Sequence, residues 1–229
     1  MLEIDIKKSL RDFDLEVKMV IKEGEILMLV GDNGCGKTSL LNLVAGLQDP
    51  EKGRIALDGR PLFDSNLKIN VTPEERNIGY VFQSYALFPH MSVYDNVAFG
   101  LRARRLSRGE IGVALRDHLE AAGLWDIRKA RAIDVSGGQK QRVALARALI
   151  MELDLLLLDE PLSALGVRKQ AAMRRDLRER IHACHVPSIV PSIIVTHDLT
   201  DVACIGDRAC LLERGKIVLT WGADEVMGW

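Results

Sequence analysis

Apolar and charged residues alternate at the start of the chain, in residues 2–7 and again in residues 13–17. This period of two predicts two half-buried strands that pair as an antiparallel edge. Residues 26–30 are instead apolar throughout, which predicts a strand buried on both faces, and a glycine-rich turn then leads into a predicted helix over 37–45. Further buried strands are predicted at residues 78–82, 155–158 and 193–196.

Helical patterns separate these buried strands, and the section from residue 84 to residue 149 is rich in helix formers. Such alternation is typical of a parallel sheet wrapped by helices. We therefore predict an α/β fold with a parallel-sheet core, an antiparallel β edge and an inserted helical subdomain. Residues 1–83 and 150–229 are expected to form the α/β core, and residues 84–149 the helical subdomain.

The composition restricts the class of protein further. The 229 residues are 48% hydrophobic, and a chain of this size removes about 70% of its extended surface from water on folding, enough for one sizeable core. The 31 Lys and Arg balance 32 Asp and Glu, which argues against nucleic acid as a partner. No apolar run approaches the ~20 residues that cross a bilayer, and the N-terminus lacks the apolar core of a secretory signal. The cysteines have no framework spacing, so we expect free thiols in the cytoplasm.

A phosphate-binding motif stands between the first buried strand and the first helix. Residues 31–38 satisfy G-x-x-x-x-G-K-[ST], and the motif requires this strand-before, helix-after context. Its glycines let backbone N–H groups converge on an anion, Lys37 reaches the terminal phosphates, and the Thr38 hydroxyl is a ligand for Mg²⁺. The residues predicted to bind nucleotide here are Gly31, Asp32, Asn33, Gly34, Cys35, Gly36, Lys37, Thr38 and Ser39.

Acidic residues and a histidine follow two of the later buried strands. Asp159 ends the run 155–158 and is predicted to hold Mg²⁺ through water, while Glu160 is free to activate the attacking water. His197 follows the strand at 193–196 and is expected at the same sheet edge as Glu160. Its imidazole would either contact a γ-phosphate or hold the attacking water.

A second anion-binding device opens a helix within the helical section. A Ser-Gly-Gly turn precedes the helical pattern that runs to residue 149. One nucleotide does not need two such cradles from one subunit, whereas two subunits placed head to tail complete each other's site. The residues of this device are Ser136, Gly137, Gly138 and Gln139.

In these motifs the chain resembles the ATP-binding cassette family over essentially all 229 residues. Residues 31–38 match its Walker A motif, 135–139 its signature, 155–160 its Walker B motif, Gln83 its Q-loop and His197 its switch histidine. The resemblance implies the P-loop NTPase fold, ATP and Mg²⁺ as cofactors, and Gln83 as a further magnesium ligand. It also implies a homodimer that holds two Mg-ATP, closes on ATP binding and reopens on hydrolysis.

Within that family, residues 77–97 resemble the importer ATPases for molybdate or tungstate, sulfate, ferric iron, polyamines and sugars, and residues 1–10 are most similar to the molybdate/tungstate type. The apolar and aromatic section from Tyr85 to Met91 follows the site directly. It is expected either to form a groove for a helix of transmembrane permease subunits or to pack the helical lobe onto the body. The resemblance therefore implies a peripheral ATPase on the cytoplasmic face of the cell membrane, energising an oxyanion importer.

The chain departs from the family pattern in three places. Gly166 stands where the family usually has aspartate and offers no carboxylate to the dimer interface, which leaves coupling between the two sites open. Residues 9–12 include no adenine-stacking ring, so either Leu10 gives apolar contact or Phe13 substitutes for it. The C-terminal regulatory domain of many such importers is expected to be missing after Trp229.

Three further groups of residues carry reactive or charged side chains. Cys35 lies near a helix N-terminus and Lys37, which favours the thiolate, and alkylation there is expected to block ATP binding. His182, Cys184 and His185 match no zinc spacing, and the exposed end of a charged helix explains them better. A solvated helix face is predicted for Arg174, Arg175, Asp176, Arg178, Glu179 and Arg180.

Two other functions remain open from the sequence. A soluble cassette ATPase in DNA repair or translation is one, although such proteins usually carry coiled-coil insertions, tandem cassettes or basic arms. A nucleotide-binding regulator without catalysis is the other, because Gly166 departs from the family pattern. Intact Glu160 and His197 argue against the regulator.

Overall fold

The computed structural model describes residues 1–104, 106–163, 167–183 and 190–222. The chain divides into two compact units. The first comprises Met1–Tyr80, Leu153–Glu160 and Arg174–Trp229, and the second Val81–Glu152 and Pro161–Met173. The second unit thus holds the section 84–149 that the sequence assigns to a helical subdomain, together with residues 161–173.

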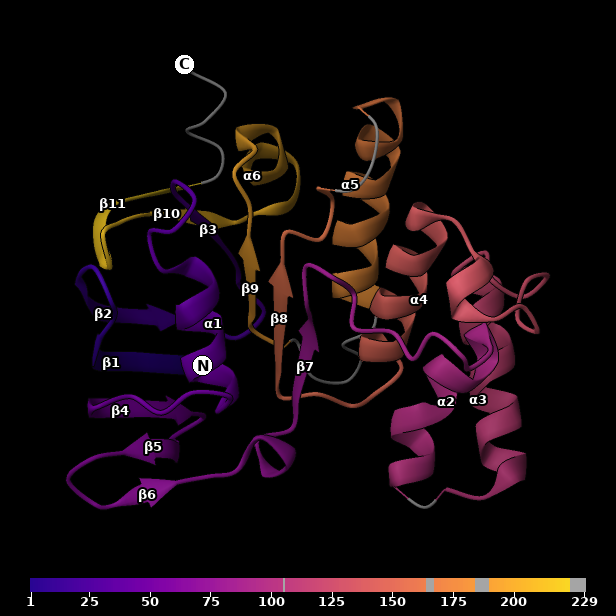
Figure 1. Ribbon diagram of the computed structural model, residues 1–229, viewed down its shortest axis with the longest axis horizontal. Helices are drawn as coiled ribbons and strands as arrows, with labels where there is room; N and C mark the ends of the chain where they lie inside the picture. Colours follow the sequence, from indigo (N-terminus) through magenta and orange to yellow (C-terminus); the bar gives the residue numbers. More distant parts are fainter. Residues whose placement is uncertain (105, 164–166, 184–189, 223–229) are drawn as a thin grey trace. The chain divides into compact units, whose positions relative to one another are not determined.

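One mixed sheet dominates the first unit (Figure 1). In the described part of the chain its strand order is β6-β5-β4-β1-β2-β11-β10-β3-β9-β8-β7. The strands are β1 (Leu2–Ser9), β2 (Asp14–Ile21), β3 (Ile26–Val30), β4 (Lys52–Leu57), β5 (Arg60–Asp64), β6 (Ile69–Asn70), β7 (Ile78–Val81), β8 (Leu155–Asp159), β9 (Ser192–Val195), β10 (Arg208–Glu213) and β11 (Lys216–Gly222).

The central strands are parallel and buried, as the continuous apolar runs predict. β3 pairs in parallel with β9 and β10, and β8 pairs in parallel with β9. Every residue of β3, β8 and β9 is buried. A strand that is buried on both faces has apolar residues at successive positions, mostly Val, Ile and Leu. The α/β fold class is therefore confirmed.

The antiparallel part of the sheet is larger than predicted. β1 and β2 pair antiparallel over their whole length, which confirms the alternating pattern. β1 is not an edge strand, however, because β4 pairs with its other side and β5 and β6 follow. The sequence did not predict β4, β5 and β6. Gly53 interrupts β4 and Pro61 interrupts β5, and in neither strand do buried and exposed residues alternate along its whole length.

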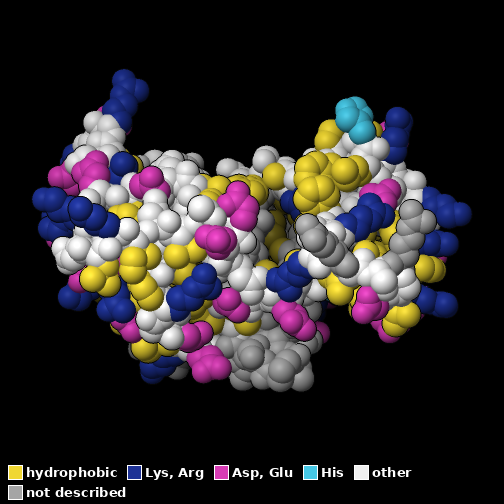
Figure 2. All heavy atoms as spheres, turned by 90° about the horizontal axis from the view of Figure 1, so that it is seen from below, with side chains coloured by type: hydrophobic (Ala, Val, Ile, Leu, Met, Phe, Trp, Pro, Cys, Tyr) yellow, Lys and Arg dark blue, Asp and Glu magenta, His cyan; other side chains and the backbone are white. Residues whose placement is uncertain are grey.

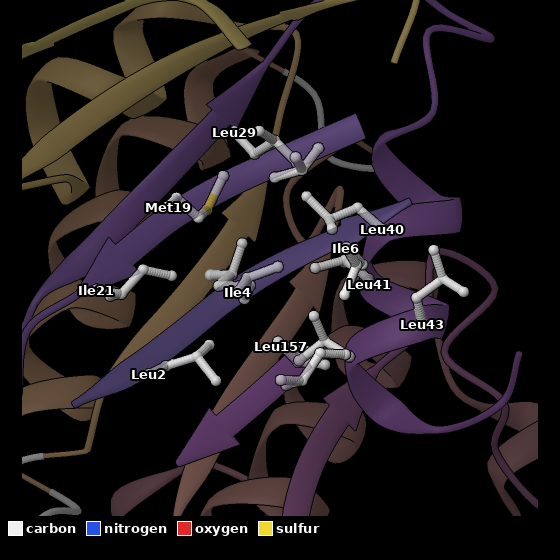
Figure 3. Packing of buried hydrophobic residues seen from close by; sticks show 14 of the residues in the cluster. Leu2, Ile4, Ile6, Met19, Ile21, Leu29, Leu40, Leu41, Leu43 and Leu157 are labelled. Atoms are coloured by element: carbon white, nitrogen blue, oxygen red, sulfur yellow. The ribbon is translucent and has the colours of Figure 1, made fainter. Parts of the chain in front are cut away.

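Helix α1 (Lys37–Ala45) packs on this sheet and carries the phosphate loop at its N-terminus. Its Leu40, Leu41 and Leu43 join a single hydrophobic core with side chains of the antiparallel and parallel strands. Figure 3 shows Leu40 and Leu41 next to Ile6 of β1. Because the apolar face of α1 packs against one continuous core, the loop before the helix is anchored to the sheet.

The second unit is helical and has its own core. Its helices include α2 (Val93–Ala103), α3 (Arg108–Ala121) and α4 (Gly137–Leu149), whose apolar faces meet in one cluster. Ser92, Ser107 and Ser136 each cap the following helix by accepting a hydrogen bond from a backbone N–H of the first turn. Short 3-10 turns lie at Pro73–Glu75 and Ala132–Asp134.

Two helices follow β8 in the sequence. They are α5 (Val167–Ala183) and α6 (Leu199–Ile205). The prediction of a solvated arginine face on α5 is wrong for Arg174, which is 7% exposed, and Arg178 is half-buried. Both arginines pair with carboxylates that lie on or beside α6.

Two of the predictions concern residues outside this description. Gly166, Cys184 and His185 lie outside the described residues. Within the described ranges, no group of three or more His, Cys, Asp or Glu side chains is placed to hold a metal ion. In the same ranges, none of the helices combines the length and apolar character that crossing a bilayer requires.

Candidate nucleotide-binding site

The phosphate loop follows β3 and is built on glycine. Gly31 has φ +149°, and a Cβ at this position would lie 2.2 Å from the carbonyl oxygen of Leu212. Gly36, with φ +111°, is the N-cap of α1 and provides no side-chain cap. The first N–H groups of α1 are therefore left to bind another acceptor, which is the property that makes helix N-termini anion sites.

The ammonium of Lys37 lies inside this loop. Lys37 is 6% exposed, and its Nζ donates hydrogen bonds to the carbonyl oxygens of Gly31 at 2.7 Å and Asp32 at 2.8 Å. The Sγ of Cys35 is 3.8 Å from the same nitrogen. The positive charge is thus held where the loop amides converge, and a phosphate entering the loop would meet both.

Thr38 and Asp159 form the predicted pair of magnesium ligands. The Thr38 hydroxyl donates a hydrogen bond of 2.8 Å to Oδ2 of Asp159, which ends the buried strand β8. Burial raises the pKa of Asp159, and the negative charge of Glu160 raises it further. The hydrogen bond from Thr38 and the positive charge of Lys37 lower this pKa, but the net shift is upward. The Asp159 carboxylate and the Thr38 hydroxyl both offer hard oxygen atoms, the kind of ligand that Mg²⁺ prefers. The residues present therefore fit the ion.

Glu160 and His197 lie together at the carboxyl ends of two adjacent parallel strands. Asp159 of β8 pairs in register with Val195 of β9, and the backbone N–H of Glu160 donates to the Val195 carbonyl at 3.0 Å. Nδ1 of His197 lies 3.2 Å from Oε1 of Glu160. Glu160 has φ +47°, a left-handed conformation that costs a non-glycine residue energy and is typical of functional positions.

The Ser-Gly-Gly turn lies in the second unit, as the start of α4. Ser136 Oγ accepts from the Gln139 N–H at 3.4 Å, and Gln139 Oε1 accepts from the Ser136 N–H at 2.8 Å, which makes a capping box. A Cβ added to Gly137 would meet no atom within 4 Å. The helix end is therefore rigid and open to an incoming group. Gln83 also lies in the second unit, so its role as a magnesium ligand stays a prediction.

Both candidates for adenine contact lie beside the phosphate loop. A Cβ on Gly36 would lie 3.5 Å from Cε2 of Phe13 and 3.7 Å from Cδ1 of Leu10. Phe13 is half-buried, and it is the aromatic member of this pair. A ring offers more stacking area than a leucine, so we favour Phe13 for this role.

Sequence reasoning missed three side chains that hold the elements carrying the site. Tyr80 donates a hydrogen bond of 3.1 Å to Oδ1 of Asn42 on α1, and burial raises its pKa, with the Asp159 charge adding to the shift. Arg76 is fully buried and donates to carbonyls at the end of α1. Asp201 is 5% exposed and receives a hydrogen bond from Thr196. None belongs to a motif, so only the tertiary contacts identify them.

Alkylation of Cys35 is expected to abolish ATP binding, because the added group would occupy the loop beside Lys37. Cys35 is 7% exposed, so its thiol should react slowly unless the protein is briefly treated with denaturant. The measurement is the affinity for a fluorescent ATP analogue before and after complete modification. A Cys35→Ser variant treated in the same way keeps its affinity and so controls for the exposed Cys204. Unchanged affinity of the fully modified parent would refute the expectation.

P-loop proteins hold nucleoside triphosphates with a glycine loop around a lysine and with a threonine–aspartate pair, and here the aspartate ends the parallel strand β8. By fold and site, the chain is a P-loop nucleotide-binding protein. The family model described as ABC transporter matches residues 15–163. The chain belongs to the ABC transporter family, and the resemblance seen in its motifs is confirmed.

Relatives and solved structures agree with this assignment. The trehalose/maltose import ATP-binding protein MalK of Thermococcus litoralis is 40% identical over 92% of this chain and 56% of its own length. The molybdate/tungstate import ATP-binding protein WtpC of Pyrococcus horikoshii is 37% identical over 95% of this chain and 61% of its own length. A dimeric ATP-binding cassette in a post-hydrolysis state, bound to ADP and Pi, has a TM-score of 0.81 at 25% identity, over 97% of this chain and 99% of that chain. The chain thus spans little more than half the length of these curated relatives.

Proposed function

We propose that this protein is the ATP-binding and ATP-hydrolysing subunit of a membrane importer. The observation that carries the proposal is the 3.2 Å approach of His197 to Glu160, next to the Thr38–Asp159 pair. A nucleotide-binding regulator needs the phosphate loop and the magnesium ligands only. A carboxylate and an imidazole held together at the same strand ends are what hydrolysis requires in addition.

Each residue has one task in this proposal. Lys37 and the loop amides bind the phosphates, and Thr38, Asp159 and Gln83 hold Mg²⁺. The bound ion neutralises negative charge on the phosphate oxygens. Glu160 accepts the proton of the attacking water at its carboxylate, and His197 holds the water or the γ-phosphate in place. Phe13 supports the adenine.

The proposed active form is a homodimer. The open start of α4, with Ser136 and Gly137, would contact the nucleotide bound to the phosphate loop of the partner subunit. The dimeric state of the solved cassette with TM-score 0.81 supports this arrangement. Two equivalent sites would then be completed only when both subunits meet.

The proposed permease contact is the section from Tyr85 to Met91. Phe88 is 36% exposed and Phe99 of α2 is 44% exposed, and their ring centroids are 4.5 Å apart. An exposed pair of aromatic rings is a feature of surfaces that bind apolar partners. We therefore propose that a helix of the transmembrane permease subunits binds here, which would place the protein on the cytoplasmic face of the cell membrane.

On the face shown in Figure 2, basic and acidic side chains are mixed, which is not typical of a nucleic-acid site. Lys and Arg side chains are interspersed with Asp and Glu across the face shown in Figure 2. Nucleic-acid sites are usually marked by clustered positive charge. This agrees with the balanced 31 basic and 32 acidic residues of the whole chain.

For the transported substrate we propose an oxyanion such as molybdate or tungstate. The support is the likeness of residues 1–10 to that type of importer and the similarity to WtpC. Co-purification of the intact complex and identification of its ligand tests the cargo separately from the ATPase.

Replacing both Phe88 and Phe99 by Ser is expected to abolish association with the permease, because the exposed apolar contact area is lost. The measurement is co-purification with membrane vesicles that contain the permease subunits, with and without ATP. A matched control is Val113→Ser on α3, where the side chain is 72% exposed and lies outside the proposed contact. Retained co-purification of the double variant would exclude this surface. Stimulation of the ATPase by nucleic acid instead of permease would exclude the importer function.

A further inference from the structure

A buried arginine of α5 lies beneath the segment that carries His197. The Arg174 side chain is 8% exposed, and its Nε donates a hydrogen bond of 2.6 Å to Oδ1 of Asp201. Another guanidinium nitrogen donates at 2.6 Å to Oδ2 of Asp198. Both contacts are charge-assisted, and they use two different nitrogens of the planar guanidinium, which a lysine with its single nitrogen would not reproduce.

The same contacts fix the backbone on both sides of His197. Thr196 Oγ1 donates to Oδ2 of Asp201 at 2.7 Å and accepts from the Asp198 N–H at 3.1 Å. Asp198 is the N-cap of α6, and its Oδ1 accepts from the N–H of Thr200, the second residue of that helix. His197 is therefore flanked by two residues whose positions depend on the carboxylates that Arg174 holds.

The His197 side chain itself has little packing to hold it. It is 61% exposed, whereas Glu160, which it approaches at 3.2 Å, is 12% exposed. Because few side-chain contacts hold the exposed imidazole of His197, its distance from the Glu160 carboxylate depends on the position of the His197 backbone. A shift of about 1 Å in a reacting group is enough to cost roughly 10²-fold in rate.

We propose that Arg174 is a positioning residue for hydrolysis, which acts by holding Asp198 and Asp201 so that His197 meets Glu160. This inference rests on the role proposed above for His197. A purely structural role is the competing explanation, because a buried ion pair that loses one partner destabilises a fold.

Arg178 provides a matched comparison one turn further along α5. Its guanidinium donates to the carbonyls of Ile205 and Gly206 at 2.8 and 2.9 Å and to Asp207 at 2.9 Å. It thus makes a similar set of contacts at the other end of α6, and none of these contacts is to residues 196–198. A structural role predicts similar effects from both arginines.

The test compares Arg174→Gln and Arg178→Gln in the parent and in a His197→Ala background. For Arg174→Gln we expect kcat to fall about 10- to 100-fold, with KM for ATP and nucleotide affinity within about twofold of the parent. We expect no further fall of kcat when Arg174→Gln is added to His197→Ala. Arg178→Gln should lower the melting temperature and leave kcat within about threefold.

A spectroscopic readout covers the case of very low activity. The imidazole NMR signal of His197, assigned by its loss in His197→Ala, should shift in Arg174→Gln and stay in place in Arg178→Gln. Should Arg174→Gln fail to fold, Asp198→Asn replaces it, since this partly exposed residue keeps its helix-capping oxygen and loses its charge.

The outcomes separate the two proposals. Parent-like kcat in a folded Arg174→Gln or Asp198→Asn protein overturns the positioning role alone. An equal fall of kcat in the presence and absence of His197 also overturns it, because the effect would not pass through that residue. Unchanged kcat in His197→Ala rejects the proposed function of His197 and this inference with it.

Discussion

Replacing Glu160 by Gln is expected to lower the ATPase rate by about 10²- to 10⁴-fold, the range for loss of a positioned general base. The amide is nearly the same size and keeps the left-handed backbone position, but it cannot take a proton from water. ATP binding depends on the phosphate loop and should persist. Because the proposed dimer reopens only after ATP is hydrolysed, the variant should also accumulate as a long-lived dimer with bound ATP. Phosphate release and size-exclusion chromatography measure the two effects.

Glu152→Gln supplies the control for this experiment. The Glu152 side chain is exposed and lies before β8, eight residues from Glu160, so its loss of charge should change neither rate nor assembly. A parent-like hydrolysis rate in Glu160→Gln would show that another group is the base. Fast hydrolysis together with a monomer at all concentrations would reject the dimer as well.

Replacing Arg76 by Ala is expected to cost about 3–5 kcal/mol of unfolding free energy, through unsatisfied buried groups and a cavity. The side chain is fully buried. It donates to the carbonyls of Leu43 at 3.1 Å and Val44 at 2.7 Å, near the end of α1, and to that of Val71 at 2.9 Å. Burial lowers the pKa of Arg76, yet the guanidinium keeps its proton at neutral pH. Urea unfolding followed by circular dichroism gives the value.

Arg60→Ala is the matched control for Arg76. Arg60 is exposed and donates one hydrogen bond of 3.1 Å to the Glu75 carbonyl, so its removal should cost less than about 1 kcal/mol. Equal stability of the two variants would mean that the carbonyls at the end of α1 find other donors. The position of α1 matters for function because its opposite end carries the phosphate loop.

Much of the site was predictable from local pattern. The strand at 26–30 and the helix at 37–45 have the bounds of β3 and α1, because a buried strand, a glycine turn and a helix start are all local features. The placement of Glu160 near His197 also followed from the sequence, since the carboxyl ends of parallel strands share one edge of a sheet. Their roles in hydrolysis stay predictions until the variants are measured.

Other features depend on partners far along the chain. Arg174 was assigned to a solvated face because charges spaced along a helix look the same whether they face water or distant carboxylates. Its partners Asp198 and Asp201 lie 24 and 27 residues later. Arg76 was missed for the same reason, since its acceptors on α1 come 32 and 33 residues earlier.

The amino-acid sequence by itself determined the phosphate loop, the order of the motifs and the family, because each rests on neighbouring residues or on a short spacing. Only the tertiary structure decided that Arg174 is buried against Asp198 and Asp201, and that Arg76 is buried against the last carbonyl groups of α1. These contacts join residues that lie 24 to 33 positions apart in the sequence. The packing of the whole sheet and its helices decides which distant residues meet, and a local sequence pattern does not record it.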